Sequence, residues 1–325
     1  MIGLLSSVFV VQALHVAVEL GLADLLATGS RSLEELAGAC WADQAALRRL
    51  LRMLAAYGVF REDEAGSFAL TPLAATLRTD ARVPVRDWAR CVCAPASWAS
   101  WGELLHAIKT GEAAFDHAHG NRFYEHLADD PALAGPFASW MTGQSELHNA
   151  ALLSSYDFSQ FDTVVDVGGG KGATLAAVLR AQPAVRGVLL DRAEVVAAAP
   201  PLQDFVDRCE IVGGDATRFV PAGGDCYLIK RVLMDHSDDA TTAILRKCVG
   251  AMAADGRVLV VEMVIAPGNE PSAATTFDLL MLALFPGGRI RTEAEWRALF
   301  AVAGLTLAKV IEAPSPNLVL EGRLS

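Results

Sequence analysis

The segment "VVDVGGGKGA", residues 164–173, constrains the fold more than any other part of the sequence. A short run of β-branched residues leads directly into a glycine cluster, and the helical pattern "ATLAAVLRAQ" follows. Glycines let the backbone approach a ligand closely, and the N-terminus of the next helix faces the same place. The segment therefore predicts a strand, a tight turn, a helix and a ligand site between them.

Further strands alternate with helical stretches over the rest of this half of the chain. The expected strands are "GVLLD", "CEIVGGD", "DCYLIKRV" and "RVLVVEMV", and "TTAILRKCVGAMAA" is one of the helical stretches between them. Alternation of this kind indicates the α/β class, with a parallel sheet covered by helices on both faces. A ligand of such a sheet binds at the carboxyl ends of its strands.

The first 79 residues have a different pattern, with helices followed by a hairpin. "SLEELAGA" begins with Ser32 and Glu35 in capping-box spacing, and "VFREDEAGSFALTP" contains two short strands around a Gly-Ser turn. This order is a winged-helix plan, which in some proteins binds DNA. The acidic charge of the chain makes a dimerisation or lid role the better interpretation.

Composition limits the partners. The formal net charge is −11 without a compensating basic run, so we expect no nucleic-acid partner. The start, "MIGLLSSVFVVQALHVAVELGL", resembles an amphipathic helix with polar breaks, so we expect no membrane partner and a cytoplasmic protein. His117 and His119 lack a third ligand at useful spacing, and no metal site is expected.

Three acidic residues fall at successive strand ends. Asp166 precedes the glycine turn, Asp191 ends the second strand and Asp215 follows the third. Such acids suit the ammonium, ribose hydroxyls and adenine amine of S-adenosylmethionine. Gly168 and Gly170 with Ala173 also satisfy the G-x-G-x-x-A dinucleotide pattern, so an NAD enzyme stays open as an alternative.

At this point the sequence resembles a known family. "VVDVGGGKGA", "GVLLD", "GGDA", "LIKRVLMD", "DGRVLVVE" and "FPGGRIRTEAEW" are similar to small-molecule O-methyltransferases, which include plant phenylpropanoid and bacterial polyketide and phenazine enzymes. The N-terminal "VQALHVAVELGLADLL" matches as well. The resemblance implies a homodimer, S-adenosylmethionine or S-adenosylhomocysteine as the cofactor, and a small-molecule acceptor that is an aromatic or polyketide-like natural product.

The resemblance also implies a division of the chain. We expect a winged-helix-like dimerisation domain over residues 1–97, a helical connector and lid over 98–153, and a Rossmann-like methyltransferase domain over 154–325.

Candidate site residues follow from the motifs and from the resemblance together. The candidate cofactor-binding residues are Ser145, Asp166, Gly168, Gly170, Asp191, Asp215 and Lys230. The candidate acceptor-binding residues are Met141, His148, Met234, Phe277, Asp278, Met281, Phe285 and Ile290.

The chain departs from the family at its catalytic positions. Phenol-methylating members carry a histidine base flanked by two glutamates, and Met234 occupies the histidine position here. Glu262 matches one glutamate, whereas Ile290 replaces the other. His236, two residues after Met234, and Glu262 are therefore the candidate catalytic residues.

Three interpretations of this departure remain open. Orientation of donor and acceptor can supply about 7 to 11 kcal/mol of a barrier without a base, so methyl transfer can proceed by proximity alone. His236 can serve as a relocated base. The fold can also have been repurposed for a non-methylating reaction such as cyclisation, hydroxylation or decarboxylation. A ligand-sensing DNA binder is a further alternative.

Overall fold

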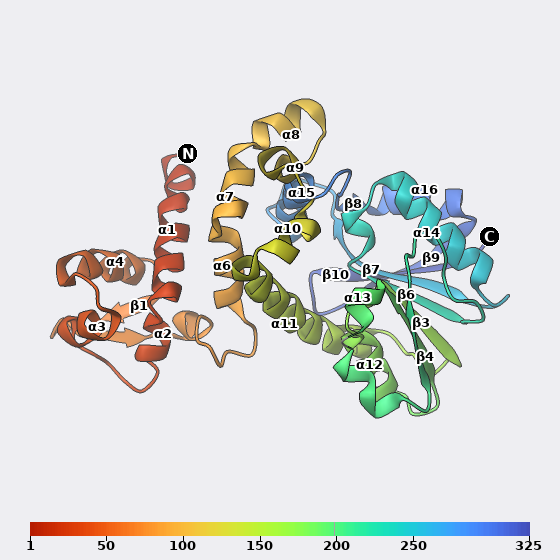
Figure 1. Ribbon diagram of the computed structural model, residues 1–325, viewed down its shortest axis with the longest axis horizontal. Helices are drawn as coiled ribbons and strands as arrows, with labels where there is room; N and C mark the ends of the chain where they lie inside the picture. The colour runs from red at the N-terminus through yellow and green to blue at the C-terminus, as the bar shows by residue number, and fades with distance from the viewer. Residues whose placement is uncertain (198) are drawn as a thin grey trace. The chain divides into compact units, whose positions relative to one another are not determined.

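The computed structural model describes residues 1–197 and 199–325, which form two compact units. One unit comprises residues 1–99 and 124–144, and the other comprises residues 100–123 and 145–325. A long helix, α11 (Pro131–Ser155), contributes to both. Figure 1 shows the helical elements of the first unit and the strands of the second.

The first unit contains the expected helices and hairpin. Ser32 caps α3 and forms a reciprocal capping box with Glu35. Strands β1 and β2 pair antiparallel, as predicted. Leucines and phenylalanines from these elements form one core, with Leu22, Leu36 and Phe68 fully buried. Its elements are α1 (Ile2–Glu19), α2 (Leu22–Leu25), α3 (Leu33–Cys40), α4 (Gln44–Ala56), β1 (Phe60–Glu62), β2 (Phe68–Leu70), α5 (Pro72–Ala75), α6 (Val85–Cys93), most of α7 (Pro95–Gly102) and most of α10 (Phe123–Asp129).

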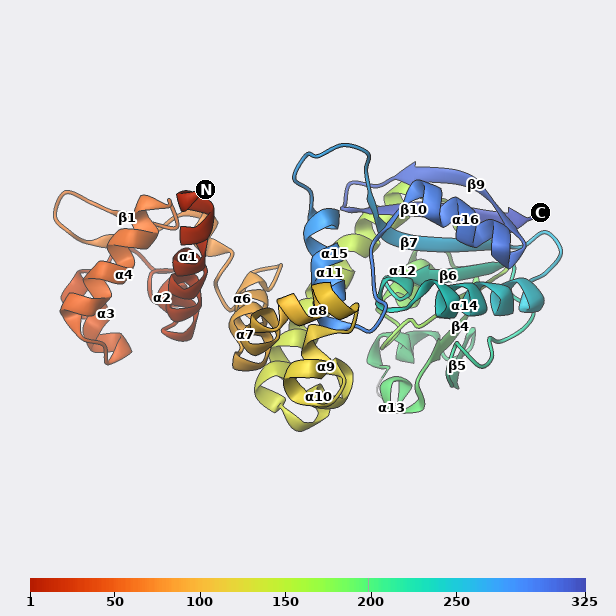
Figure 2. The same cartoon turned by 90° about the horizontal axis from the view of Figure 1, so that it is seen from above.

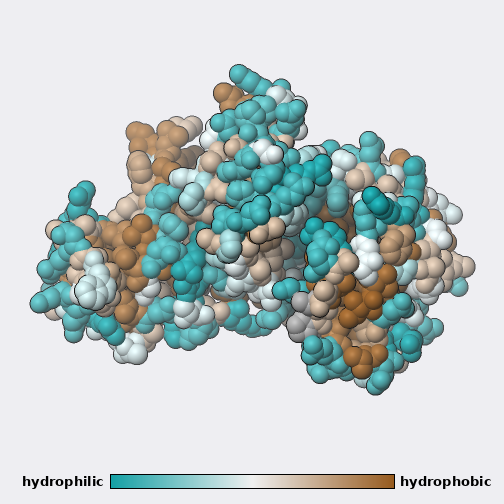
Figure 3. All heavy atoms as spheres, viewed as in Figure 1, coloured by the Kyte–Doolittle hydropathy of each residue, from teal (hydrophilic) through white to brown (hydrophobic). Residues whose placement is uncertain are grey.

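Helix α1 differs from the amphipathic helix we expected. Only Ala13, Ala17 and Val18 are buried, while Leu5 and Phe9 on its outer surface are 69% and 64% exposed. The exposed N-terminal end is a brown patch in Figure 3. By length and composition alone α1 is long and apolar enough to cross a membrane, whereas the sequence pattern predicted an amphipathic helix. The core helix of a soluble protein and a signal sequence near the N-terminus pass the same test.

The second unit is built on a mixed sheet with the order β5-β4-β3-β6-β7-β10-β9, and β8 pairs with β7. The first five strands of this order are parallel, while β10 and β9 add antiparallel. Figure 2 shows β9, β10, β7, β6, β4 and β5 following one another across the unit. The strands are β3 (Thr163–Val167), β4 (Arg186–Asp191), β5 (Cys209–Gly213), β6 (Cys226–Lys230), β7 (Arg257–Ile265), β8 (Arg291–Thr292), β9 (Leu305–Glu312) and β10 (Asn317–Leu324).

Helices cover both faces of this sheet, as the alternation predicted. Successive strand residues point to opposite faces, so Val164 belongs to one core and Val165 to the other. The C-terminal end of α11 and α12 pack on the first face, whereas α14 and α16 pack on the second. The helical elements of the unit are α8 (Leu104–Thr110), α9 (Ala114–His119), α12 (Ala173–Ala181), α13 (Ala193–Val196), η1 (Pro200–Phe205), η2 (Leu233–Asp235), α14 (Asp238–Ala251), α15 (Ala273–Leu284) and α16 (Glu293–Ala303).

The glycine turn after β3 is built for close approach. Gly168 has a φ of 71°, and a Cβ there would lie 2.7 Å from a methyl carbon of Val232. A Cβ on Gly169 would lie 2.5 Å from the carboxyl carbon of Asp166. Side chains at these two positions would displace the loop after β6 or the Asp166 carboxyl group. The turn therefore leads the backbone tightly between β3 and the start of α12.

Candidate functional site

The carboxyl edge of the parallel strands brings together two of the acids noted in the sequence. Asp191 ends β4, and its Oδ2 accepts a hydrogen bond from the Gly170 N–H at 2.7 Å. Asp215 follows β5 and accepts from the N–H and the hydroxyl of Thr217 at 2.8 and 2.7 Å. These bonds lower the pKa of Asp215. Hydrogen bonds from the chain thus hold both carboxylates at the strand ends.

Asp166 and Lys230 form a buried pair of opposite charges in the same region. Asp166 is 1% exposed and Lys230 is 9% exposed. Neither Asp166 oxygen nor the Lys230 Nζ has a hydrogen-bond partner of good geometry in the described part of the chain. Burial raises the Asp166 pKa to about 7 although Lys230 lowers it, and burial lowers the Lys230 pKa to about 8. Buried polar atoms of this kind normally bind a partner, so the pair is suited to a polar ligand.

Helix α11 presents polar residues to this edge. Ser145 is half-buried, and His148 is 2% exposed. The Asn149 Oδ1 accepts a hydrogen bond from the Thr174 hydroxyl at 3.0 Å, which joins α11 to the first turn of α12. Burial first, and then the charges of Arg231 and Lys230, lower the His148 pKa to about 4. His148 is therefore a neutral imidazole near pH 7.

The chain turns sharply at Arg231, directly after β6. Arg231 has a φ of 55°, and Trp41 is the one other non-glycine residue with a positive φ in the two described segments. The next three backbone N–H groups, of Val232, Leu233 and Met234, converge on one oxygen of Glu262 at 3.0, 3.0 and 3.3 Å. The carboxylate of Glu262 therefore fixes the loop by its backbone.

Arg291 holds the same loop from its other side. Its side chain is fully buried and donates to the carbonyl oxygens of Leu233 at 2.9 Å and His236 at 2.8 Å. It also donates to the Asp238 carboxylate at 2.8 Å. Since Glu262 binds the amides and Arg291 binds the carbonyls, the loop between β6 and α14 has one well-defined conformation.

The proposed acceptor residues of this unit gather around Met234 on apolar surfaces. Met234, Ile290, Met281 and Phe285 are 3%, 2%, 4% and 8% exposed. The Arg289 N–H donates to the Met234 carbonyl at 2.8 Å, so the segments that carry Met234 and Ile290 run side by side. No proton-accepting side chain stands at either of these two positions.

Phe277, Asp278 and Met141 complete the set of proposed acceptor residues. Phe277 lies in α15, and the Arg231 guanidinium carbon is 5.8 Å from its ring centroid. Asp278 accepts a hydrogen bond from the Ile290 N–H at 2.8 Å, so it supports the wall of the site. Met141 lies in the part of α11 that belongs to the first unit.

His236, the proposed relocated base, lies near the acid at the end of β5. Burial and Arg291 lower its pKa, whereas Asp215 raises it. His236 in turn lowers the pKa of Asp215. Its charged neighbours are thus Arg291 and Asp215. Ser237, immediately after it, is the N-cap of α14, and its side chain accepts a hydrogen bond from the Ala240 N–H.

His117, noted in the sequence, and Asp238 at the start of α14 are engaged elsewhere. The ring of His117 stacks on His106 with a centroid distance of 3.7 Å. Asp238 pairs with Arg291 and Arg289 at the start of α14. Within residues 1–197 and 199–325, no group of three or more His, Cys, Asp or Glu side chains is arranged to hold a metal ion.

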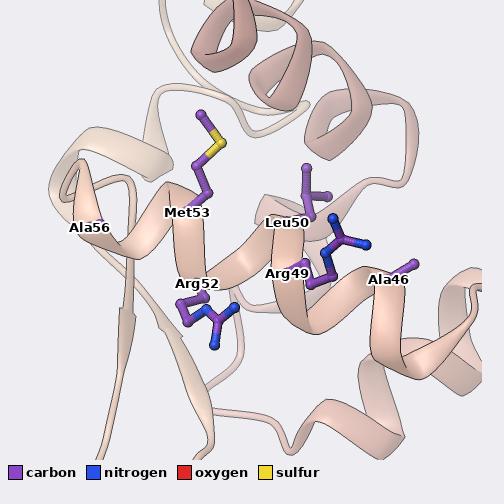
Figure 4. Close-up of a pocket in the computed structure, with 6 residues that line it drawn as sticks. All are labelled: Ala46, Arg49, Leu50, Arg52, Met53 and Ala56. Atoms are coloured by element: carbon purple, nitrogen blue, oxygen red, sulfur yellow. The ribbon is translucent and has the colours of Figure 1, made fainter. Parts of the chain in front are cut away.

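A shallow surface hollow on the first unit is unrelated to this site. Figure 4 shows that the side chains lining it all come from one helix, α4, and they are Ala46, Arg49, Leu50, Arg52, Met53 and Ala56. Side chains from a single helix do not converge on a ligand as those at the sheet edge do.

Comparison with known families identifies the chain. Residues 101–306 match the O-methyltransferase domain, and residues 2–80 match the O-methyltransferase dimerisation domain. The chain belongs to the O-methyltransferase family. It is a methyltransferase that uses S-adenosylmethionine, and its α/β fold with an N-terminal dimerisation domain confirms the prediction from sequence.

Individual relatives of this O-methyltransferase match along nearly their whole length. The phenazine O-methyltransferase PhzM of Lysobacter antibioticus is 38% identical over 99% of this chain and 95% of its own. The mitomycin biosynthesis 6-O-methyltransferase of Streptomyces lavendulae is 42% identical over 92% of this chain and 86% of its own. The structure of NcsB1, an O-methyltransferase from neocarzinostatin biosynthesis in complex with S-adenosylmethionine and 2-hydroxy-5-methyl naphthoic acid, is 35% identical, covers 97% of this chain and 96% of that one, and has a TM-score of 0.82.

Arg231 and Arg291 are site residues that the sequence reasoning missed. The signal for Arg231 was its place directly after Lys230 at the end of an expected strand. Its positive φ and its contact with α15 depend on tertiary structure. Arg291 carried no signal, because a buried arginine that binds a distant loop looks in sequence like a surface charge.

Proposed function

We propose that this enzyme transfers the methyl group of S-adenosylmethionine to a hydroxyl oxygen of a small aromatic natural product in the cytoplasm. The proposal is carried by the buried side chains of Met234 and Ile290. The polar residues proposed for the cofactor, Asp166, Asp191, Asp215 and Lys230, lie at the carboxyl edge of the same sheet. The named acceptors of the phenazine and mitomycin relatives, and the naphthoic acid bound to NcsB1, support an aromatic acceptor. The same relatives favour methyl transfer over a non-methylating reaction.

The sheet edge fits the cofactor. Asp166 can accept from the ammonium of the methionine part, with Ser145, Gly168 and Gly170 beside it. Asp191 can accept from the ribose hydroxyls, and Asp215 can accept from the adenine amine. Lys230 supplies a buried positive charge between them. The buried oxygens of Asp166 support this assignment, because no described residue satisfies them.

The sulfonium of S-adenosylmethionine supplies an electrophilic methyl group when it is bound. The residues of this chain then have to orient the acceptor and exclude water. The rigid loop that Glu262 and Arg291 hold places Met234 in one position, and Met281, Phe285 and Ile290 add apolar walls. Orientation in a dry pocket contributes about 7 to 11 kcal/mol to lowering such a barrier.

Neither nearby histidine is suited to act as the base. The His148 pKa of about 4 makes its imidazole too weak to take a proton from a phenol with a pKa near 10. His236 has Asp215 and Arg291 as charged neighbours, which favours a role beside the cofactor. The acceptor therefore reacts from an acidified or already ionised hydroxyl group, and Glu262 acts as an anchor of the loop.

The first unit supplies the homodimer. We assign dimerisation to residues 1–97, and the apolar outer surface of α1 supports this because a partner subunit would cover it. Residues 98–153 form a connector and lid. Helices α8 and α9 within this segment pack against α15, which carries Phe277 and Met281.

The test is a coupled product assay with purified enzyme, S-adenosylmethionine and a panel of aromatic hydroxy compounds and amines. We expect S-adenosylhomocysteine to form in step with a gain of one CH₂ on the acceptor, and NMR of the product to place the methyl group on oxygen. Methylation on nitrogen would overturn the choice of atom. An acceptor that is consumed or rearranged while S-adenosylmethionine stays unspent would overturn methyl transfer.

A further inference from the structure

Two polar side chains point to the same face of the sheet at its carboxyl edge. Val164 of β3 and Leu228 of β6 belong to the core that packs against α11 and α12. Asp166 and Lys230 stand two residues further along the same two strands, so their side chains point to the same face. The strands pair in parallel with Asp166 opposite Leu228, so the two strand ends are neighbours.

Helix α11 adds His148 to this face. Leu152 packs into the same core, and His148 lies one turn before it on the same side of the helix. Ser145, a candidate cofactor residue, lies three residues earlier on that side. The adjacent Asn149 accepts a hydrogen bond from Thr174 in the first turn of α12, directly after the glycine turn. His148 is therefore fixed over the ends of β3 and β6, beside the glycine turn.

Asp166, Lys230 and His148 form a buried trio that no described residue satisfies. Their side chains belong to residues that are 1%, 9% and 2% exposed. Both oxygens of Asp166, the Nζ of Lys230 and the Nδ1 of His148 are buried and have no hydrogen-bond partner among the residues that the structure describes. Buried polar atoms normally bind a protein group or a ligand. Since the three groups share one face and one edge, one ligand can bind all of them.

The trio has the chemistry of a site for an amino acid. Asp166 supplies acceptors and Lys230 supplies a positive charge with three donors, while a neutral imidazole supplies one N–H donor and one acceptor. These groups complement the ammonium and the carboxylate of a zwitterion. The neighbouring Asp191 already accepts from the Gly170 N–H at 2.7 Å. Asp166 is thus the acid suited to the ammonium group, as the proposed function assigns.

The surrounding charges place His148 on the carboxylate side of such a ligand. Burial first, and then the cations Arg231 and Lys230, lower the His148 pKa to about 4, so the imidazole is neutral near pH 7. The carboxylates Asp166 and Glu262 act on Lys230, where they oppose the lowering of its pKa by burial and by Arg231. Lys230 therefore lies between the acids and the imidazole. A neutral N–H donor on the far side of a lysine is suited to share a carboxylate with that lysine.

We propose that the Nδ1–H of His148 donates a hydrogen bond to the carboxylate of the amino-acid part of S-adenosylmethionine. His148 then belongs to the cofactor site, whereas the sequence placed it among the acceptor residues. This inference rests on the cofactor site of the proposed function and adds a residue to it. The carboxylate would be bound by His148 and Lys230 together, and the ammonium by Asp166.

The test compares two ligands that differ by one carboxyl group, S-adenosylhomocysteine and its decarboxylated analogue, which keeps the amine. Each is titrated into the enzyme by calorimetry. The variants are His148→Phe, which keeps a ring without nitrogen atoms, and His148→Asn, which can place an amide N–H close to the position of Nδ1. His117→Phe on α9 is the matched control, because His117 lies outside the trio and a phenyl ring can keep the stacking on His106.

We expect the unaltered enzyme to bind S-adenosylhomocysteine at least about 10-fold more tightly than the decarboxylated analogue. His148→Phe should weaken binding of S-adenosylhomocysteine about 10- to 100-fold, the range for loss of a hydrogen bond to a charged group, and change binding of the analogue less than about twofold. His148→Asn should fall between His148→Phe and the unaltered enzyme. His117→Phe should match the unaltered enzyme with both ligands.

Three results would overturn the inference. Equal affinity of the unaltered enzyme for both ligands would mean that no residue recognises the carboxylate. Unchanged affinity of His148→Phe for S-adenosylhomocysteine would exclude the hydrogen bond. Equal losses for both ligands in His148→Phe would give His148 a packing role only. The proposed function fails separately, because it fails only if no methyl group reaches any aromatic oxygen, and the cofactor site at the sheet edge is tested independently through Asp191.

Discussion

One oxygen of Glu262 accepts a hydrogen bond from the backbone N–H of Met234 at 3.3 Å, and the same oxygen binds the two preceding N–H groups. In the family pattern that the sequence resembles, two glutamates flank a histidine base at this position. In this chain the carboxylate instead holds the backbone of the residue that stands in place of the base. Glu262 therefore has a structural reason to be present without a catalytic histidine.

Glu262→Ala should destabilise the protein. The change leaves three N–H groups without their acceptor, two of them on buried residues, and we expect the free energy of unfolding to fall by about 2 to 4 kcal/mol. Glu262→Gln keeps an amide oxygen and should lose about 1 kcal/mol. Urea titration measures both. Glu312→Ala, on an exposed position of β9, is the control and should change stability by less than about 0.5 kcal/mol. An equal free energy of unfolding in all three variants would refute the role of Glu262 in anchoring the loop.

Asp191→Ala should weaken cofactor binding while leaving the fold intact. Asp191 is half-buried at the strand end, so its loss removes acceptors for the ribose hydroxyls and frees the Gly170 N–H. We expect the dissociation constant of S-adenosylhomocysteine to rise about 10- to 100-fold by calorimetry. Asp239→Ala, an exposed residue in the first turn of α14, should leave it unchanged. Unaltered affinity in Asp191→Ala would disprove the site at the sheet edge.

The sequence predicted the fold well because its signals were local. The capping box at Ser32 and the glycine turn at Gly168 each depend on a few neighbouring residues, and the structure confirms them. Membership of the O-methyltransferase family confirmed that the cofactor is S-adenosylmethionine. The outer surface of α1 was misjudged, because polar breaks at Ser6 and Ser7 do not make a polar face.

The details of the site were beyond local signals. Arg291 reaches the Leu233 carbonyl across 58 residues of chain, and Asp278 reaches the Ile290 N–H across 12. Glu262 was expected near the reaction as a catalytic residue, yet its hydrogen bonds are to backbone. The sequence and its match to the family predict which side chain stands at each position. The hydrogen-bond partner of that side chain depends on tertiary packing.

Cofactor binding should weaken as the pH falls below about 7. Burial raises the Asp166 pKa to about 7, so below that value the carboxyl group is protonated and must lose a proton to bind an ammonium group. We expect the affinity for S-adenosylhomocysteine to fall by up to about tenfold per pH unit between pH 7 and 5.5. Calorimetry across this range in unaltered enzyme and in Asp166→Asn provides the check. The variant should bind weakly at every pH, and an equal slope in both proteins would exclude Asp166 as the titrating group.

Charges on the exposed face of α1 should separate the homodimer. Leu5 and Phe9 are largely exposed in one chain, so Leu5→Glu with Phe9→Glu should leave each chain folded and place negative charges in the covered surface. We expect light scattering after size exclusion to change from about 69 kDa, twice the mass of the 34.4 kDa chain, to one chain. Val302→Glu, an exposed apolar position on α16, is the control and should remain dimeric. If the double variant stays dimeric, the dimer interface does not include this face of α1. If the unaltered enzyme floats with lipid vesicles, α1 binds a membrane.

Met234→His should restore a base where the family carries one. Met234 is 3% exposed, and its backbone is fixed by Glu262 and by the Arg289 N–H, so an imidazole at this position would be held as rigidly as the thioether. The second oxygen of Glu262 is buried without a partner in the described residues and could accept an imidazole N–H. General base catalysis contributes about 10²- to 10⁴-fold, so we expect kcat/KM on 2-naphthol to rise by about 10²-fold.

The pH profile of the variant separates base catalysis from a change in pocket shape. A new imidazole base loses activity as it is protonated, so kcat/KM of Met234→His should acquire an acidic limb near pH 6 to 7 that the unaltered enzyme lacks. Met53→His in the first unit should leave both the rate and the profile unchanged. If Met234→His gives no gain on 2-naphthol between pH 6 and 9, proton removal does not limit turnover. Orientation of the donor and the acceptor would then be sufficient for the reaction that this enzyme performs.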